Sequence, residues 1–288
     1  MTVWVAAWLH GYVAADDVLD ALAPWAGLHE VVAADELTAA QFDLPLPNAM
    51  PYSPAMLLAT VRRAGATSAR LILPVPGDTR GLTPAWDTLG LTPARDTLGL
   101  TPACDTLGLT PETQRQGSFG SDALRAGEGM LLAGADIGVV PKTVAEGVVR
   151  WTVHRTSTAG SAGYIGLAEA EHALRCAVRD ATATLTGLDI ARHRPEVRGQ
   201  IADTLAARPR PPWPNGTPGR VLRVLENADE VTAILTAAAG DDGAAVSAPQ
   251  ARARSEALRP LAAAVRAARL AAVAEAVRAL TDDRAGRH

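Results

Sequence analysis

The stretch "GVVRWTVHRTSTAGSAGYIGLAEAEHALRCAVRD", residues 147–180, contains the change of pattern on which the fold prediction depends. Its beginning, "GVVRWTVHRT", is rich in β-branched and aromatic side chains, which is typical of a strand. From Leu167 onward, apolar side chains recur at the spacing of one helical face, through Leu174 and Val178 to Leu185. The sequence therefore predicts that a strand-containing part gives way to a helical part near residues 156–166.

Upstream of this change, strand and helix patterns alternate. The sequence predicts helices over 15–27 and 53–65, the second with Ser53 as its N-cap and Pro54 in its first turn. Strands are predicted at 3–9, 29–34 and 69–75, and again within 129–140 and 147–156, where the pattern indicates a meander or hairpin pair. Residues 1–157 are therefore predicted to form a mixed, partly parallel sheet with short helices.

Downstream of the change, only helix patterns remain. Helices are predicted over 166–187, 194–207, 217–240 and 247–280, and the short connection between the last two predicts an antiparallel hairpin. The fold class is therefore α+β or α/β, with an N-terminal mixed sheet and a C-terminal α-helical bundle. The predicted domains are residues 1–157 and an Ala-rich helical domain of residues 166–288.

A nine-residue unit is repeated within residues 81–113, in three near-identical copies and a fragment of a fourth. Only its sixth position differs, as Trp86, Arg95 and Cys104. Calcium-binding nonapeptide solenoids need paired glycines and an Asp at fixed positions, and this unit lacks that pattern. We interpret the repeat as an expanded surface loop, with no long element expected between residues 77 and 119.

Composition narrows the class of protein. Apolar residues make up 48% of the chain and the formal net charge is −4, so neither nucleic acid nor a membrane surface is an expected partner. The frequent Ala, Arg, Gly and Pro have GC-rich codons and favour a bacterial source. Two cysteines are too few for a disulfide framework and indicate the cytoplasm, and no apolar run is long enough to span a membrane.

Two loops are candidate ligand sites. Asp78, Thr79 and Arg80 directly follow the third predicted strand, and ligands of open α/β sheets bind beyond the carboxyl ends of strands. Gly160 and Gly163 lie before a helix, where backbone N–H groups can bind a phosphate. An ordinary turn and an interdomain linker are the simpler interpretations of these two segments.

Metal-binding residue types also gather on one predicted helix, where Glu169, His172 and Cys176 share a face. A di-iron site needs a second Glu-x-x-His pattern, which the sequence lacks. We therefore predict a solvated polar face, with no metal and no cofactor. His154, in a predicted strand, has no spacing that marks it as a catalytic base.

These patterns favour a cytoplasmic bacterial protein that works through binding or assembly, with its helical half as the interaction surface. The expected partner is an unknown protein or a small molecule, and a homo-oligomer is a further alternative. A rival interpretation is a small-molecule enzyme or phosphate-binding protein that uses Asp78, Thr79 and Arg80. The two interpretations differ in whether a polar pocket or an exposed apolar surface is expected.

Overall fold

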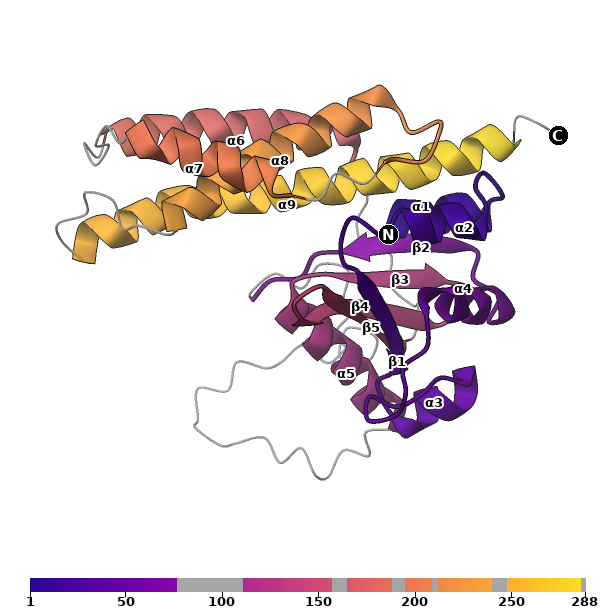
Figure 1. Cartoon of the computed structure of the whole chain (residues 1–288). Coiled ribbons are helices and arrows are strands. Elements are labelled where there is room, and N and C mark those ends of the chain that lie inside the picture. Colours follow the sequence, from indigo (N-terminus) through magenta and orange to yellow (C-terminus); the bar gives the residue numbers. More distant parts are fainter. Residues whose placement is uncertain (77–110, 157–164, 188–194, 209–211, 240–247, 286–288) are drawn as a thin grey trace, which may run out of the picture. The chain divides into compact units, whose positions relative to one another are not determined.

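The computed structural model describes residues 1–76, 111–156, 165–187, 195–208, 212–239 and 248–285, with only the backbone described at 111–118, 195–196, 248–249, 251 and 283–285. The chain divides into two compact units, Met1–Ala162 and Gly163–His288 (Figure 1). The first unit holds a mixed sheet with short helices and the second is helical, which confirms the predicted fold class. Among the described helices, none is both long and apolar enough to cross a membrane.

The first unit is built on a five-stranded sheet with the order β1-β5-β4-β3-β2. Its strands are β1 (Leu28–Ala33), β2 (Ser68–Ile72), β3 (Gly129–Ala133), β4 (Ile137–Ala145) and β5 (Val148–Arg155). β1 pairs with β5 in parallel, and the other neighbours are antiparallel. The predicted partly parallel sheet is therefore present, and the predicted meander or hairpin pair is a meander of β3, β4 and β5.

The turn between β3 and β4 explains how the stretch "GMLLAGADIGVV" forms two strands. Gly134 has a φ of +82°, and an added Cβ would lie 2.9 Å from the carbonyl oxygen of Gly65. Asp136 also has a positive φ, of 51°, which Asp tolerates better than most residues do. The chain can reverse tightly here because a glycine occupies the most crowded position.

The first predicted strand is wrong, because residues Thr2–Leu9 form helix α1. Val3, Val5 and Trp8 are all buried, and so are the two alanines between them. A helix that is apolar on every side has no helical periodicity to distinguish it from a buried strand. α1 packs along β2, and the guanidinium of Arg62 lies over the Trp8 ring, 4.1 Å from its centre.

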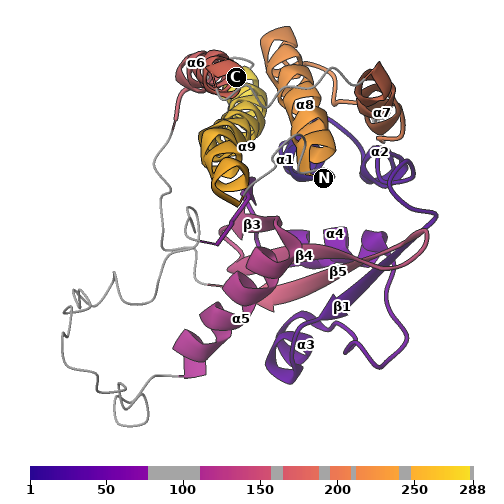
Figure 2. The same cartoon turned by 90° about the vertical axis from the view of Figure 1, so that its left-hand side faces the viewer.

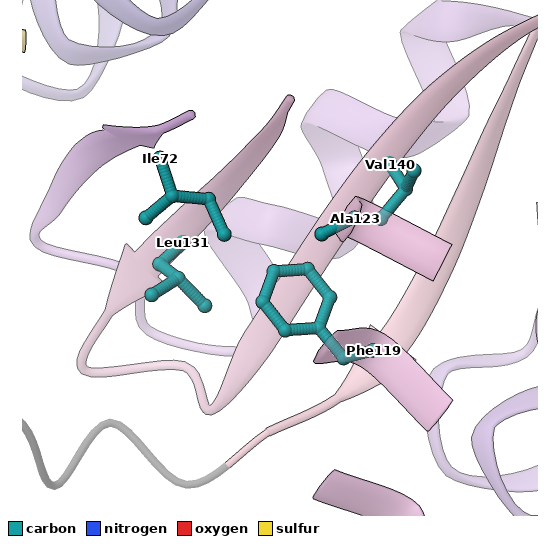
Figure 3. Packing of buried hydrophobic residues seen from close by; sticks show 5 residues of the cluster. All are labelled: Ile72, Phe119, Ala123, Leu131 and Val140. Carbon is teal, nitrogen blue, oxygen red and sulfur yellow. The ribbon is translucent and has the colours of Figure 1, made fainter. Parts of the chain in front are cut away.

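Four more helices complete the first unit. They are α2 (Ala15–Asp20), α3 (Glu36–Phe42), α4 (Pro54–Arg63) and α5 (Pro111–Ala126). α5 corrects the expectation of a loop without a long element up to residue 119, because the helix begins at Pro111. It places Phe119 and Ala123 against Ile72 of β2, Leu131 of β3 and Val140 of β4 (Figure 3).

The second unit consists of α6 (Leu167–Gly187), α7 (Pro195–Ala206), α8 (Gly219–Ala239) and α9 (Ala248–Ala285). α6 and α8 both pack on the long helix α9, while α7 packs on α8 (Figure 2). Asp229 on α8 accepts hydrogen bonds from Arg269 on α9 at 2.6 Å and from Arg208 at 2.8 Å. The apolar stripes predicted for α6 and α8 supply the buried residues Leu174, Val221 and Val224.

Candidate functional site

The ligand-binding residues predicted from the sequence, Asp78, Thr79, Arg80, Gly160 and Gly163, all lie outside the described residues. The strands that precede the two loops, β2 and β5, are among the described residues. β2 and β5 run in opposite directions in the sheet, so they end at opposite edges. The strand ends therefore give no support to a single site built from both loops.

The face shared by Glu169, His172 and Cys176 is present on α6 and is occupied by polar contacts. The Cys176 sulfur lies 3.4 Å from Nε2 of His172 and 3.0 Å from a guanidinium nitrogen of Arg179. Within the described part of the chain, no three His, Cys, Asp or Glu side chains are grouped so that they could hold a metal ion. The Cys176 sulfur is thus in contact with both His172 and the Arg179 guanidinium.

A groove of about 510 Å³ lies between α6 and α8. Its apolar lining comes from Leu174 and Val178 on α6 and from Val224 and Val231 on α8. The groove exists because α6 and α8 contact α9 extensively and each other very little. The two helices therefore hold a strip of apolar surface open between them.

Two apolar side chains of these helices remain exposed. Val178 belongs to the predicted apolar stripe of α6, yet 36% of its surface is accessible, because α9 covers only part of that stripe. On α8, Ile234 is 48% exposed, and it follows Val231 at a spacing of three residues, which places both on one side of the helix. Val178 lines the groove, whereas Ile234 lies beyond its lining residues on α8.

Charged side chains border the groove. Glu171 of α6 accepts two hydrogen bonds from the Arg220 guanidinium on α8, at 2.8 and 3.0 Å, and these bonds hold the pKa of Glu171 below its ordinary value. Arg175 on α6 also lies 3.6 Å from Glu171, while Arg179 on α6 and Glu230 on α8 line the groove further along. The groove therefore carries basic side chains on α6 and one acidic side chain, Glu230, on α8.

A second unusual arrangement lies in the sheet unit, around His154 of β5. Only 1% of this residue is exposed, and neither ring nitrogen has a hydrogen-bond partner among the described residues. The Phe119 ring of α5 packs edge-on against the imidazole, with the ring centres 5.6 Å apart. A buried imidazole without a partner is costly, so this position calls for an explanation.

Two carboxylates affect the pKa of His154. Asp122 of α5 places one oxygen 3.5 Å from Nε2, and the charge of Asp35, which follows β1, also reaches the ring. Burial lowers the pKa of His154, and the two carboxylates counteract only part of that effect, so the pKa remains below its ordinary value. His154 is therefore neutral at pH 7.

Asp35 is held in place by the helix that it caps. Its Oδ1 accepts a hydrogen bond of 2.7 Å from the backbone N–H of Thr38, the third residue of α3. Burial alone would raise the pKa of Asp35, but hydrogen bonds from Thr38 and Leu37 outweigh it and lower the pKa. The carboxylate is thus charged and fixed at the carboxyl end of β1.

Sequence reasoning missed this cluster. Alternation along "WTVHRT" does place Thr152, His154 and Thr156 on one face of a strand. No pattern, however, links them to Asp35 and Asp122, which lie far away along the chain. Their proximity arises from the parallel pairing of β1 with β5 and from the packing of α5, and neither can be read from spacing.

Known proteins resemble both units. A family model described as the N-terminal domain of Rv1486c-like proteins matches residues 1–121, and the model of their C-terminal domain matches residues 168–270. An uncharacterised protein of Mycobacterium tuberculosis, Rv1486c, is 33% identical to this chain, over 95% of this chain and 94% of its own length. An uncharacterised protein of Mycobacterium leprae is 30% identical over the same shares of the two chains. No solved structure matches the chain.

Proposed function

The chain belongs to the Rv1486c-like family, whose matched relatives are mycobacterial, and we propose that it is an assembly protein that pairs with a second copy of itself. The pairing surface is the groove between α6 and α8. The observation that carries this proposal is the apolar lining of that groove, which includes the exposed side chain of Val178. Helices that leave an apolar strip uncovered gain stability when a further helix covers it.

Charge complementarity favours a second copy as the occupant. In a two-fold pair, the same surface of each copy meets its equivalent, so α6 of one copy can lie over α8 of the other. This arrangement brings Arg175 and Arg179 of each α6 wall opposite Glu230 of the partner's α8 wall. The groove is therefore self-complementary in charge, while the apolar lining supplies the free energy of association.

The free energy gained by burying these apolar side chains is large enough to support dimerisation. Complete burial of one Val or Ile side chain contributes about 1.5–3 kcal/mol relative to leaving it exposed, and a two-fold interface counts each side chain twice. Part of this gain offsets the loss of translational and rotational freedom. We therefore expect a reversible dimer whose population depends on protein concentration.

Sedimentation velocity of the full chain over a range of concentrations tests the pairing. We expect a monomer–dimer equilibrium, and we expect Val178→Asp to weaken it by about tenfold or more, because a buried carboxylate without a partner is costly. Ala183→Asp is the matched control, since Ala183 is an exposed residue on the opposite side of α6. A chain that stays monomeric at every concentration, or equal effects of the two variants, would rule out the proposal.

Charge reversal tests the orientation of the pair. Arg179→Glu alone and Glu230→Arg alone should each weaken the dimer, because each creates like-charge contacts between the walls. The double variant should recover dimerisation, because it restores opposite charges across the interface. If the double variant is as weak as the sum of the single variants, the proposed packing of α6 over α8 is wrong.

Two further parts of the function are also proposals. We expect the pairing to take place in a bacterial cytoplasm, a location that the low number of cysteines supports. A small-molecule or phosphate site at Asp78, Thr79 and Arg80 is the alternative function. A thermal-shift screen of ligands on the full chain, repeated with Asp78→Ala and Arg80→Ala, tests this alternative independently of the dimer.

A further inference from the structure

The groove between α6 and α8 contains an amide side chain within its apolar strip. Asn227 of α8 lies between Val224 and Val231, at spacings of three and four residues, so the three side chains share one side of the helix. Asn227 is exposed, and among the described residues no hydrogen bond reaches its side chain. The α8 side of the groove therefore offers a hydrogen-bonding group to whatever covers the apolar strip.

An amide in this position discriminates between partners. The apolar strip alone accepts any helix with an apolar side, because the hydrophobic effect is not directional. A helix that covered Asn227 without offering a hydrogen bond would remove the amide from water at a cost. Between paired helices, a single polar side chain of this kind selects among possible partners and lowers the affinity for those that leave it unsatisfied. Asn227 therefore favours a partner that carries a polar group at its own level.

The level of Asn227 along the groove follows from the pair Glu171–Arg220. The hydrogen bonds between these two side chains place them at about the same level, and both helices line the groove toward higher residue numbers from there. α6 and α8 therefore run in the same direction. Because an α-helix rises about 1.5 Å per residue, Asn227, seven residues after Arg220, lies at about the level of Val178, seven residues after Glu171.

A second copy of the chain presents a hydrogen-bond donor at this level. When α6 of one copy covers α8 of the other and both helices run in the same direction, the two-fold axis runs along the helices, so no residue is displaced along the groove. Asn227 then faces Val178 and Arg179 of the second copy. Among the described residues, the Arg179 guanidinium donates one hydrogen bond, to the Cys176 sulfur, so further N–H groups are available.

We propose that Asn227 makes the groove selective for a second copy of this chain, by accepting a hydrogen bond from Arg179 of that copy. This inference rests on the pairing proposed above and adds the residue that determines its specificity. The amide oxygen of Asn227 accepts the hydrogen bond, while Val224 and Val231 on either side of it pack against the second α6. A helix with an apolar side chain in place of Arg179 leaves the amide unsatisfied and binds more weakly.

Binding of a foreign helix measures this selectivity. The probe is a fluorescein-labelled amphipathic peptide with leucine on one side and alternating glutamate and lysine on the other, so that its apolar side carries no hydrogen-bond donor. In fluorescence anisotropy with the full chain, Asn227→Leu should bind the peptide about tenfold more tightly than the wild type does, because leucine removes the unsatisfied amide. Asn215→Leu is the matched control and should bind as the wild type does, since Asn215 is exposed and lies outside the lining of the groove.

Self-association of the same variants separates selectivity from a general gain in affinity. In sedimentation velocity, Asn227→Leu should change the Kd of the dimer by less than about threefold, because the loss of the hydrogen bond from Arg179 offsets the apolar gain. Arg179→Met should raise this Kd by about tenfold in the wild-type chain and by a smaller factor in Asn227→Leu, where the amide is absent. The effect that remains in Asn227→Leu reports the contact of Arg179 with Glu230.

Three outcomes contradict the role of Asn227, and they differ in what they imply for the dimer. Equal affinities of the wild type and Asn227→Leu for the peptide would show that Asn227 does not select the partner. An effect of Arg179→Met that is the same in both backgrounds would show that the two side chains do not meet. Either result, in a chain that dimerises, leaves the pairing intact, whereas a wild type that stays monomeric at every concentration overturns the pairing and this inference together.

Discussion

Gly138 of β4 lies where Phe119 of α5 packs closely against the sheet. A Cβ at this position would lie 2.5 Å from Cε2 of Phe119 and 2.7 Å from Cγ2 of Thr156, well inside van der Waals contact. We expect Gly138→Ala to lower the free energy of unfolding by about 1–3 kcal/mol, because the ring and the strand must move apart. Urea denaturation measures the loss.

The matched control is Gly199→Ala in α7, where an added Cβ would meet nothing within 4 Å. This change should raise the free energy of unfolding by about 0.5–1 kcal/mol, since alanine is the better helix former. Combining Gly138→Ala with Phe119→Leu should cost less than the sum of the single changes, because the smaller side chain makes room. Full additivity of the pair would show that the clash is not the cause.

His154 makes stability depend on pH. Burial holds the pKa of His154 below its ordinary value of about 6.5, which applies in the unfolded chain. As pH falls below about 6.5, the unfolded chain binds the proton and the folded chain does not, so the free energy of unfolding falls. The slope is at most about 1.4 kcal/mol per pH unit, and it vanishes above that range and below the folded pKa.

Urea denaturation between about pH 5 and 7 measures this slope. His154→Phe should reduce the slope, whereas His172→Gln, at an exposed position, should leave it unchanged. Asp35 does not mask the effect. Its pKa is lowered, so its contribution to stability is complete above its unfolded value of about 3.9 and is lost only at lower pH. An unchanged slope in His154→Phe would contradict the assignment.

Among the helices, the sequence predicted those that have one apolar side and one charged side. The stripes of α6 and α8 have buried residues such as Leu174 and Val224 on one side and charged residues on the other, and periodicity detects this contrast. α1 lacks such contrast and was assigned to a strand, since burial on every side removes the periodic signal. α5 was missed up to residue 119 because the repeat before it suggested a long loop.

The candidate sites were harder to predict than the elements. The apolar stripe of α6 includes Val178, but the sequence does not say which part of a stripe a neighbouring helix covers. The exposure of Val178 follows from the separation of α6 and α8 on α9, which is a property of packing. The cluster of His154 with Asp35 and Asp122 likewise depends on strand order, so it cannot be predicted from the spacing of these residues along the chain.

The nine-residue repeat lies outside the described residues and is predicted to be expendable. Deleting residues 90–107 removes two copies, and the closure entropy of a loop changes by only about 0.6 kcal/mol when its length is halved. We therefore expect the melting temperature to change by a few degrees at most. Deletion of α5, which removes Phe119 and Ala123 from the core, is the contrasting control and should unfold the sheet unit. An unfolded chain after the repeat deletion would contradict this interpretation.

At the scale of the whole molecule, each of the two units has a buried core of its own. Leu132 of β3 is fully buried in the sheet unit, and Leu261 of α9 is 6% exposed in the helical unit. Units with separate cores unfold as separate cooperative transitions unless they stabilise each other strongly. We therefore expect two transitions in scanning calorimetry of the full chain.

Matched truncations assign the transitions. Leu132→Ala and Leu261→Ala each remove the same atoms from a core, and such changes cost about 2–5 kcal/mol. Leu132→Ala should lower the melting temperature of one transition only, and Leu261→Ala that of the other only. If either variant lowers both transitions equally, or if a single transition is seen, the units are energetically coupled. Dimerisation through the helical unit would then also be expected to stabilise the sheet unit, because a partner that binds one folded unit stabilises whatever unfolds with it.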